Sequence, residues 1–237
     1  VISSYSTLST EFQILNADTP DQPFKIFQPR TEGLEYSIFH YGDLFYVVSN
    51  ADGAQNFKLS KTPENQTLKS FWRDVIPHRS DVLLKDIDVF KEFLVVSEQK
   101  NGLNQINIKR WDGTADYYLP FQSETYTAYT TNNIDFDTPL LRYGYESMTT
   151  PSSLIDFNMR SKEKIILKEQ KVLGGKFDKE NYISRRLWAT AADGTEIPIS
   201  LVKHKNTANS PDTPLLLYAY GSYGATIDPY FSPLRLS

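Results

Sequence analysis

Apolar positions along the chain fall into short runs that are rich in Val, Ile, Phe and Tyr and are bounded by Gly, Asn, Asp and Pro. β-Branched and aromatic residues favour strands, and the bounding residues favour the turns between strands. The pattern therefore predicts a mainly β chain. The clearest runs are residues 45–49 (FYVVS), 56–59 (NFKL), 93–97 (FLVVS), 105–108 (QINI), 140–143 (LLRY) and 154–157 (LIDF).

The runs recur at a regular spacing. Ser49 and Ser97 end two similar runs and lie 48 residues apart, and a comparable step leads to the third pair of runs. Asp52-Gly53 and Asn101-Gly102 lie between paired runs and predict hairpin turns, because these residues tolerate positive φ. A repeat of this length with about four strands is typical of a propeller blade. We therefore expect a partial β-propeller, with an irregular β-sandwich as the alternative. The predicted units are the tail of one blade at 1–31 and complete blades at 32–80, 81–122 and 123–170.

The character of the sequence changes near residue 171. Residues 185–203 predict a hairpin with its turn at 192–195 (ADGT). Residues 215–220 are an uninterrupted apolar run, which is typical of a strand covered on both faces. Such a strand would open an α/β sheet. The expected domains are the propeller part at 1–172 and the opening strands of an α/β domain at 173–237.

Composition narrows the classes of function. The chain contains no cysteine, which excludes disulfides, thiolate catalysis and cysteine metal sites. Its three histidines, His40, His78 and His204, are too far apart in sequence to form a helical metal pair. The net charge of −4 argues against nucleic acid as a partner, and no apolar run approaches the roughly 20 residues of a membrane helix. We expect no cofactor, no nucleic acid and no membrane.

The strongest candidate for chemistry is the segment 215–224 (LLLYAYGSYG), in which an apolar run enters a turn rich in Gly and Tyr. The hydroxyls of Tyr220 and Tyr223 are possible donors to a developing oxyanion. The alternative is that both tyrosines cap the end of a strand with a hydrated hydroxyl. The sequence has no G-x-S-x-G nucleophile elbow, and His204 lies between two lysines, as a solvated histidine would.

Longer stretches of the sequence resemble the prolyl oligopeptidase family of serine peptidases, and within it the oligopeptidase B (protease II) branch. The resemblance covers essentially the whole chain. It is carried by residues 188–202 (WATAADGTEIPISLV), 214–224 (PLLLYAYGSYG), 228–232 (DPYFS), 49–53 (SNADG), 142–145 (RYGY) and 147–151 (SMTTP).

The resemblance implies a seven-bladed propeller inserted into an α/β-hydrolase domain, with this chain forming three full blades, part of a fourth, and the first hydrolase strands. Tyr220 matches the tyrosine that donates its hydroxyl to the oxyanion, although Ala219 replaces a glycine of that motif. Tyr223 matches an aromatic residue of the substrate pocket. Asp228 matches one of two acidic residues that favour basic substrate residues, whereas the second acid falls at Tyr230.

By resemblance, the chain is expected to be a fragment of a serine oligopeptidase that cleaves short peptides after Arg or Lys, with the propeller as a size-selective gate. The family's catalytic Ser, Asp and His would lie beyond Ser237, so the chain alone is expected to be inactive. Its partners would be short basic peptides and the remainder of the same polypeptide. A cytoplasmic location is expected, with the periplasm as the alternative. The competing function is a non-catalytic propeller module that binds a partner protein.

Overall fold

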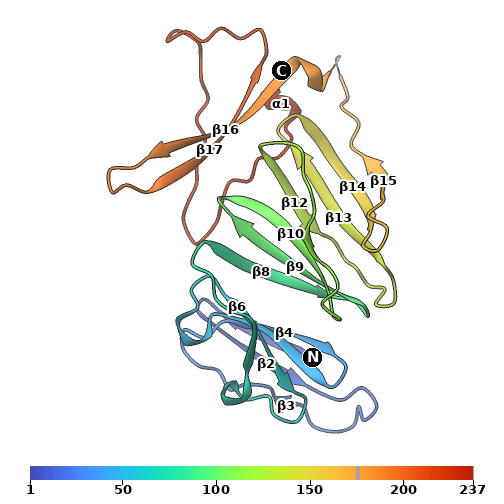
Figure 1. Ribbon diagram of the computed structural model, residues 1–237. Helices are drawn as coiled ribbons and strands as arrows, with labels where there is room; N and C mark the ends of the chain where they lie inside the picture. Colours follow the sequence, from blue (N-terminus) through green and yellow to red (C-terminus); the bar gives the residue numbers. More distant parts are fainter. Residues whose placement is uncertain (175–176, 237) are drawn as a thin grey trace. The chain divides into compact units, whose positions relative to one another are not determined.

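The computed structural model describes residues 1–174 and 177–236, and it is built mainly from antiparallel β-sheets (Figure 1). The chain divides into two units, which are described separately below. One comprises residues 1–89 and 94–98, and the other comprises residues 90–93 and the chain from 99 onward.

The first unit contains two complete sheets in which consecutive strands are neighbours. A three-stranded sheet has the order β1-β2-β3, and a four-stranded sheet has the order β4-β5-β6-β7. The strands are β1 (Ile2–Ser6), β2 (Ser9–Ile14), β3 (Lys25–Ile26), β4 (Tyr36–Tyr41), β5 (Leu44–Ser49), β6 (Lys58–Pro63) and β7 (Arg73–Ile76). Two short 3-10 turns, Ala51–Gly53 and Lys69–Phe71, precede β6 and β7.

Aromatic side chains form the core of this unit. Phe27 is fully buried, and its ring centroid lies 6.1 Å from that of Tyr36 and 6.5 Å from that of Trp72. Phe12 from β2 and Val47 from β5 join the same cluster. Burial of each large apolar side chain contributes about 1.5–3 kcal/mol, so these aromatics hold the two sheets together.

A third sheet has the order β11-β10-β9-β8. A fourth sheet, with the order β12-β13-β14-β15, lies wholly in the second unit. The strands are β8 (Val82–Val89), β9 (Phe93–Lys100), β10 (Leu103–Arg110), β11 (Asp116–Tyr118), β12 (Tyr126–Thr130), β13 (Leu140–Ser147), β14 (Thr150–Asn158) and β15 (Lys164–Glu169).

Within the second unit, β10 lies against β12, and both of their sheets bury large apolar side chains. Ile106 and Ile108 of β10 and Leu141 and Tyr143 of β13 are almost completely buried. Burial raises the pKa of Tyr143 to about 12, because the phenolate would lose its hydration.

The strand-rich repeat is confirmed at the level of sheets. Each of the predicted units 32–80, 81–122 and 123–170 contains one four-stranded antiparallel sheet. Asn101 and Gly102 form the two-residue turn between β9 and β10, with φ of 52° and 70°. Asp52 and Gly53 also have positive φ, 58° and 79°, but they lie in a longer connection between β5 and β6.

The first sheet, β1-β2-β3, and the fourth sheet, β12-β13-β14-β15, both expose apolar side chains. In the first unit, Tyr5 of β1 and the adjacent Leu8 are exposed. In the second unit, all of β15 is exposed, including Ile165 and Ile166.

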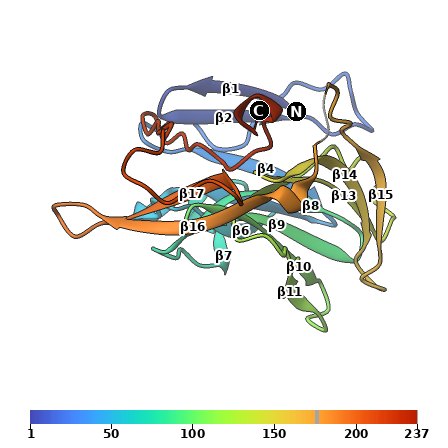
Figure 2. The ribbon, with the colours of Figure 1, turned by 90° about the horizontal axis from the view of Figure 1, so that it is seen from above.

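The hairpin predicted at residues 185–203 is also confirmed. A 3-10 turn (Lys179–Asn181) leads into β16 (Tyr182–Thr190), which pairs with β17 (Glu196–His204), and Figure 2 shows the pair as a two-stranded ribbon. Gly194 in the connecting turn has φ of 86°. The described residues end with a single helical turn, α1 (Pro233–Leu236), and no helix in the described ranges is long and apolar enough to cross a membrane.

The prediction of a buried strand at 215–220 is wrong for this structure. These residues form no strand, and Leu215, Leu216 and Leu217 are 75%, 77% and 76% exposed. A central strand takes its hydrogen bonds from neighbouring strands and its burial from covering helices. Among the residues that the structure describes, no segment pairs with this run, so its apolar side chains face solvent.

Candidate functional site

The two tyrosines predicted to carry chemistry lie on an extended segment after β17, drawn in red in Figure 1. Tyr220 is 53% exposed and Tyr223 is 97% exposed. Tyr223 has φ of 56°, which places a bulky residue in the left-handed region and bends the chain sharply just before Gly224. Both phenols are therefore presented to solvent.

The third predicted residue, Asp228, is half-buried and fixed by hydrogen bonds from three side chains. Its Oδ2 accepts from Asn104 Nδ2 at 2.8 Å and from Thr127 Oγ1 at 3.2 Å, and its Oδ1 accepts from Thr226 Oγ1 at 3.0 Å. Asn104 lies on β10 and Thr127 on β12, and both are buried. A carboxylate has about four acceptor positions, and among the described residues no second donor reaches Oδ1, so one acceptor position there is open.

Three further contacts fix the same stretch of chain. The backbone amide of Phe231 donates to Glu146 Oε2 on β13 at 2.9 Å. Gln99 Nε2 lies 3.4 Å from Thr226 Oγ1. The Phe231 ring is buried and packs edge-on against Phe177, with centroids 5.2 Å apart.

Tyr230 stands where the resemblance places a second acid, and it has a different partner. The Arg235 guanidinium donates to Tyr230 Oη at 2.7 Å and lies 4.8 Å from the centroid of its ring. Arg235 also lies 5.4 Å from the centroid of Tyr218. A cation therefore already occupies the face of this residue.

The β16–β17 hairpin brings an arginine to the turn between β9 and β10. Arg186 Nη2 donates to the carbonyl of Asn101 at 2.6 Å, and Nη1 donates to Ser200 Oγ at 2.7 Å. Its Nε is buried and has no hydrogen-bond partner among the described residues. Burial lowers the pKa of Arg186, and the negative charge of Asp228 acts in the opposite direction.

Glu124 fastens the start of this hairpin. It accepts from the Arg186 backbone amide at 3.1 Å and from Arg185 Nη1 at 2.8 Å, and both interactions lower the pKa of the Glu124 carboxyl. The hydroxyls of Thr125 and Ser184 are hydrogen-bonded beside it.

The sequence identified Asp228 but not the side chains that hold it. Asn104 and Thr127 lie 124 and 101 residues away in the sequence, and each occupies one position of an ordinary strand. Their only local signal is a polar side chain on the buried face of a strand.

Neither His40, which pairs with Glu64, nor His204, which packs on Tyr182, contacts these residues. No group of three His, Asp or Glu side chains within the described ranges could hold a metal ion.

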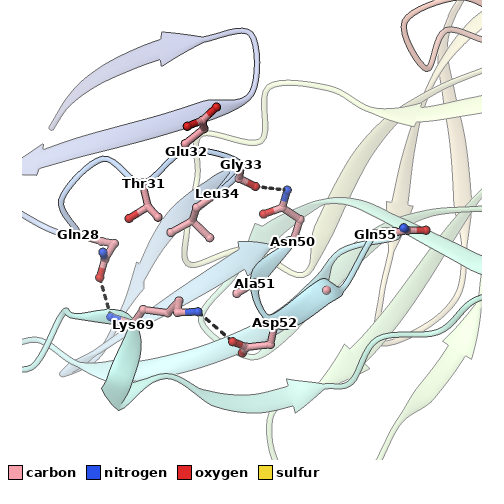
Figure 3. A pocket seen from close by; sticks show the side chains of 11 residues that line it. Gln28, Thr31, Glu32, Gly33, Leu34, Asn50, Ala51, Asp52, Gln55 and Lys69 are labelled. Atoms are coloured by element: carbon pink, nitrogen blue, oxygen red, sulfur yellow. Dashed lines mark hydrogen bonds and ion pairs between the residues drawn. The ribbon is translucent and has the colours of Figure 1, made fainter.

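A separate hollow of about 370 Å³, lined by both polar and apolar groups, lies in the first unit (Figure 3). Asp52 at its rim pairs with Lys69 at 2.9 Å and with Lys58 at 3.2 Å, and these lysines lower the pKa of its carboxyl. Gln28 accepts from the Lys69 amide at 2.7 Å across the hollow. Its polar groups are thus largely paired with one another, as expected for a hydrated surface depression.

Comparison with known proteins agrees with this architecture. Residues 1–170 match the family model "Prolyl oligopeptidase, N-terminal beta-propeller domain", and the chain belongs to this family. Among curated proteins, the chain is 39% identical over 237 residues to dipeptidyl aminopeptidase BI of Pseudoxanthomonas mexicana, covering 100% of the chain and 32% of that protein. It is 29% identical over 235 residues to Protease 2 of Moraxella lacunata, covering 99% of the chain and 33% of that protein.

Solved structures of oligopeptidase B have the same fold. Oligopeptidase B from Trypanosoma brucei, in a closed form with covalently bound antipain, superposes with a TM-score of 0.88 and 32% identity, covering 97% of this chain and 34% of that one. The chain therefore spans about a third of the length of the relatives that it matches.

Proposed function

We propose that the chain is part of a longer serine oligopeptidase that hydrolyses short peptides after Arg or Lys. The observation that carries the proposal is the extent of the similarity. The family model for the propeller ends at residue 170, whereas the similarity to peptidases named dipeptidyl aminopeptidase BI, Protease 2 and oligopeptidase B covers 97% or more of the chain. A free-standing interaction module has no need of residues 182–236, which bind back onto the sheets.

In this proposal, residues 1–172 form three full blades and part of a fourth in a seven-bladed propeller, and residues 173–237 open the hydrolase domain. The propeller would admit short peptides and exclude folded proteins. The nucleophile and its base would be supplied by the rest of the polypeptide, which we infer because the chain has no G-x-S-x-G motif. A cytoplasmic location also remains part of the proposal.

Each candidate site residue has a proposed role. Tyr220 donates its hydroxyl to the oxyanion of the tetrahedral intermediate, and its exposed phenol leaves that donor available. Tyr223 lines the substrate pocket. Asp228 binds a basic substrate group through the open position on Oδ1, because its other acceptor positions are filled by Asn104, Thr127 and Thr226.

A second candidate is release of dipeptides from the free amino end of a peptide. The observation that favours it is the 39% identity to a protein named dipeptidyl aminopeptidase BI, against 29% to Protease 2. The two activities differ in one requirement. An aminopeptidase must bind the free α-amino group of its substrate, whereas an oligopeptidase does not.

A panel of fluorogenic peptides tests both candidates on the polypeptide as it is encoded. The residue before the scissile bond is Arg, Lys, Ala or Pro, and each peptide is made with a free and with an acetylated amino end. Cleavage of acetylated Arg and Lys peptides supports the oligopeptidase. Cleavage that disappears on acetylation supports the dipeptidyl aminopeptidase, and a preference for Pro or Ala contradicts the basic specificity.

Exclusion of folded proteins by the propeller is tested in a separate experiment. One cleavable Arg-containing sequence is presented as a free peptide and again within an exposed loop of a stable folded protein. Hydrolysis of the peptide alone is expected, and equal hydrolysis of both would rule out exclusion by the propeller.

A further inference from the structure

Residues 226–231, here called the anchor segment, are fixed to the sheets of the second unit at three places. Thr226 meets Gln99, Asp228 binds Asn104 and Thr127, and Phe231 donates its amide to Glu146. The sheet residues come from the β9–β13 part of the unit, and the anchor segment comes from about a hundred residues later. Long-range contacts of this kind join the chain after the hairpin to the strands that precede it.

The central contact is a small polar network whose donors and acceptors are complementary. Asn104 Nδ2 donates both to Asp228 Oδ2 at 2.8 Å and to Thr127 Oγ1 at 3.1 Å, and the Thr127 hydroxyl donates onward to Asp228 at 3.2 Å. Asn104 and Thr127 are 9% and 6% exposed. Buried donors of this kind are costly to leave unpaired, so the network fixes Asp228 in one position.

The anchor lies close in sequence to the candidate oxyanion donor. Thr226 follows Tyr220 by six positions in the sequence, and a chain of this length spans at most about 20 Å when fully extended. Fixing Thr226 and Asp228 therefore restricts the volume that the Tyr220 phenol explores. A catalytic donor stabilises a transition state only when its position is fixed in advance, so such a restriction affects the rate.

We propose that the anchor segment holds the Tyr220–Gly224 turn on the propeller sheets, and that Asn104 and Thr127 are positioning residues of the peptidase. The catalytic half of this inference rests on the proposed function, whereas the anchoring half does not. Asp228 then has two roles. Its carboxylate fastens the anchor segment to the sheets, and it still has one acceptor position for a basic substrate group.

Exchanging the two partners provides the sharpest test. Asn104→Asp places two carboxylates against each other and should release the anchor segment. Adding Asp228→Asn restores one amide and one carboxylate with their places reversed, and Thr127 can still both donate and accept. The control is Asn107→Asp, because Asn107 lies on the same strand, is buried, and donates to Asp116 Oδ1 at 2.9 Å. It makes the same change of charge next to a carboxylate outside the anchor.

Hydrogen exchange of residues 226–231 is measured on the polypeptide as encoded. We expect about tenfold faster exchange in Asn104→Asp, recovery in the double variant, and no change at this segment in Asn107→Asp. Unchanged exchange in Asn104→Asp, no recovery in the double variant, or the same effect from Asn107→Asp would overturn the anchor. This readout needs no activity, so it decides the anchor even if the peptidase proposal fails.

Kinetics test the positioning role on the same variants. Asn104→Asp should lower kcat for every cleaved peptide about equally, and the double variant should recover it. A purely structural change would lower the folded fraction without altering kcat per folded molecule. Faster exchange with unchanged kcat would overturn the positioning role. An effect confined to KM for peptides with a second basic residue would also overturn it, since that outcome assigns Asp228 to substrate charge alone.

Discussion

The phenol oxygen of Tyr36 lies 3.1 Å from the backbone nitrogen of Phe12, and this hydrogen bond joins β4 to β2 across two sheets of the first unit. The same hydroxyl donates to the carbonyl of Gln28 at 2.9 Å. Burial raises the pKa of Tyr36, so the hydroxyl stays protonated and able to donate throughout the neutral range.

Tyr36→Phe should therefore destabilise the protein by about 1–3 kcal/mol, because the buried Phe12 amide and Gln28 carbonyl lose their partner while the ring still packs. Urea unfolding should show a lower midpoint with an unchanged slope. Tyr5→Phe is the matched control, since Tyr5 is 66% exposed. A Tyr36→Phe midpoint equal to that of the control would show that the hydroxyl contributes nothing.

Gly102 tests how closely the β16–β17 hairpin packs on the β9–β10 turn. Its φ is 70°, and a Cβ added there would lie 2.7 Å from Arg186 Nη2 and 3.1 Å from Pro198 Cγ. Gly102→Ala should cost about 1–2 kcal/mol from the left-handed backbone alone, and more from the crowding. Thermal unfolding of the Gly102→Ala variant measures the sum of the backbone cost and the crowding cost.

A matched variant at Gly113 separates the cost of the left-handed backbone from the cost of crowding. It has a similar φ of 76°, but no atom lies within 4 Å of an added Cβ. Gly113→Ala should show the backbone cost only. Equal losses for the two variants would mean that the hairpin moves away freely from the turn.

The sheets could be predicted from sequence because the interactions that form them are local. Strand alternation and the Asn101-Gly102 turn each depend on neighbouring residues, and the structure has a four-stranded sheet in each of the three units predicted as complete blades. The prediction of a buried strand at 215–220 failed because the interactions that would bury such a strand are not local. Its burial depends on partners that are not among the described residues, and hydrophobicity alone cannot supply them.

The site was only partly predictable for a similar reason. Asp228 could be singled out through a resemblance, but nothing local marks Asn104 or Thr127 as its partners. Only the folded chain brings β10 and β12 against residue 228. A buried Asn on a strand is an unusual choice, and that is the one sequence feature that could have drawn attention to it.

The ion pair at Glu124 predicts a dependence of stability on pH. The Arg186 amide and Arg185 lower the pKa of Glu124 in the folded state, so the folded state binds this proton less tightly than the unfolded state does. The resulting stabilisation is fully present above the ordinary Glu pKa and is lost as the pH falls through the folded value. Unfolding free energies of wild type and Glu124→Gln should therefore differ at pH 7 and converge once the pH has fallen below the lowered pKa of Glu124 in the folded state. Parallel pH profiles would contradict the assignment, and added salt should narrow the gap at pH 7.

Tyr220→Phe tests the proposed oxyanion donor most directly. The substitution keeps the ring and removes only the hydroxyl, so folding should be little changed because the side chain is half exposed. Removing one oxyanion donor typically lowers kcat by about 10²–10³, with KM much less affected. The measurement is hydrolysis of an Arg-containing peptide by the polypeptide as encoded. Tyr218→Phe is the control, because Tyr218 lies two residues earlier, is similarly exposed, and interacts with Arg235 through its ring. If both variants keep the wild-type kcat, Tyr220 is an aromatic residue beside a turn and the oxyanion must be stabilised by other groups.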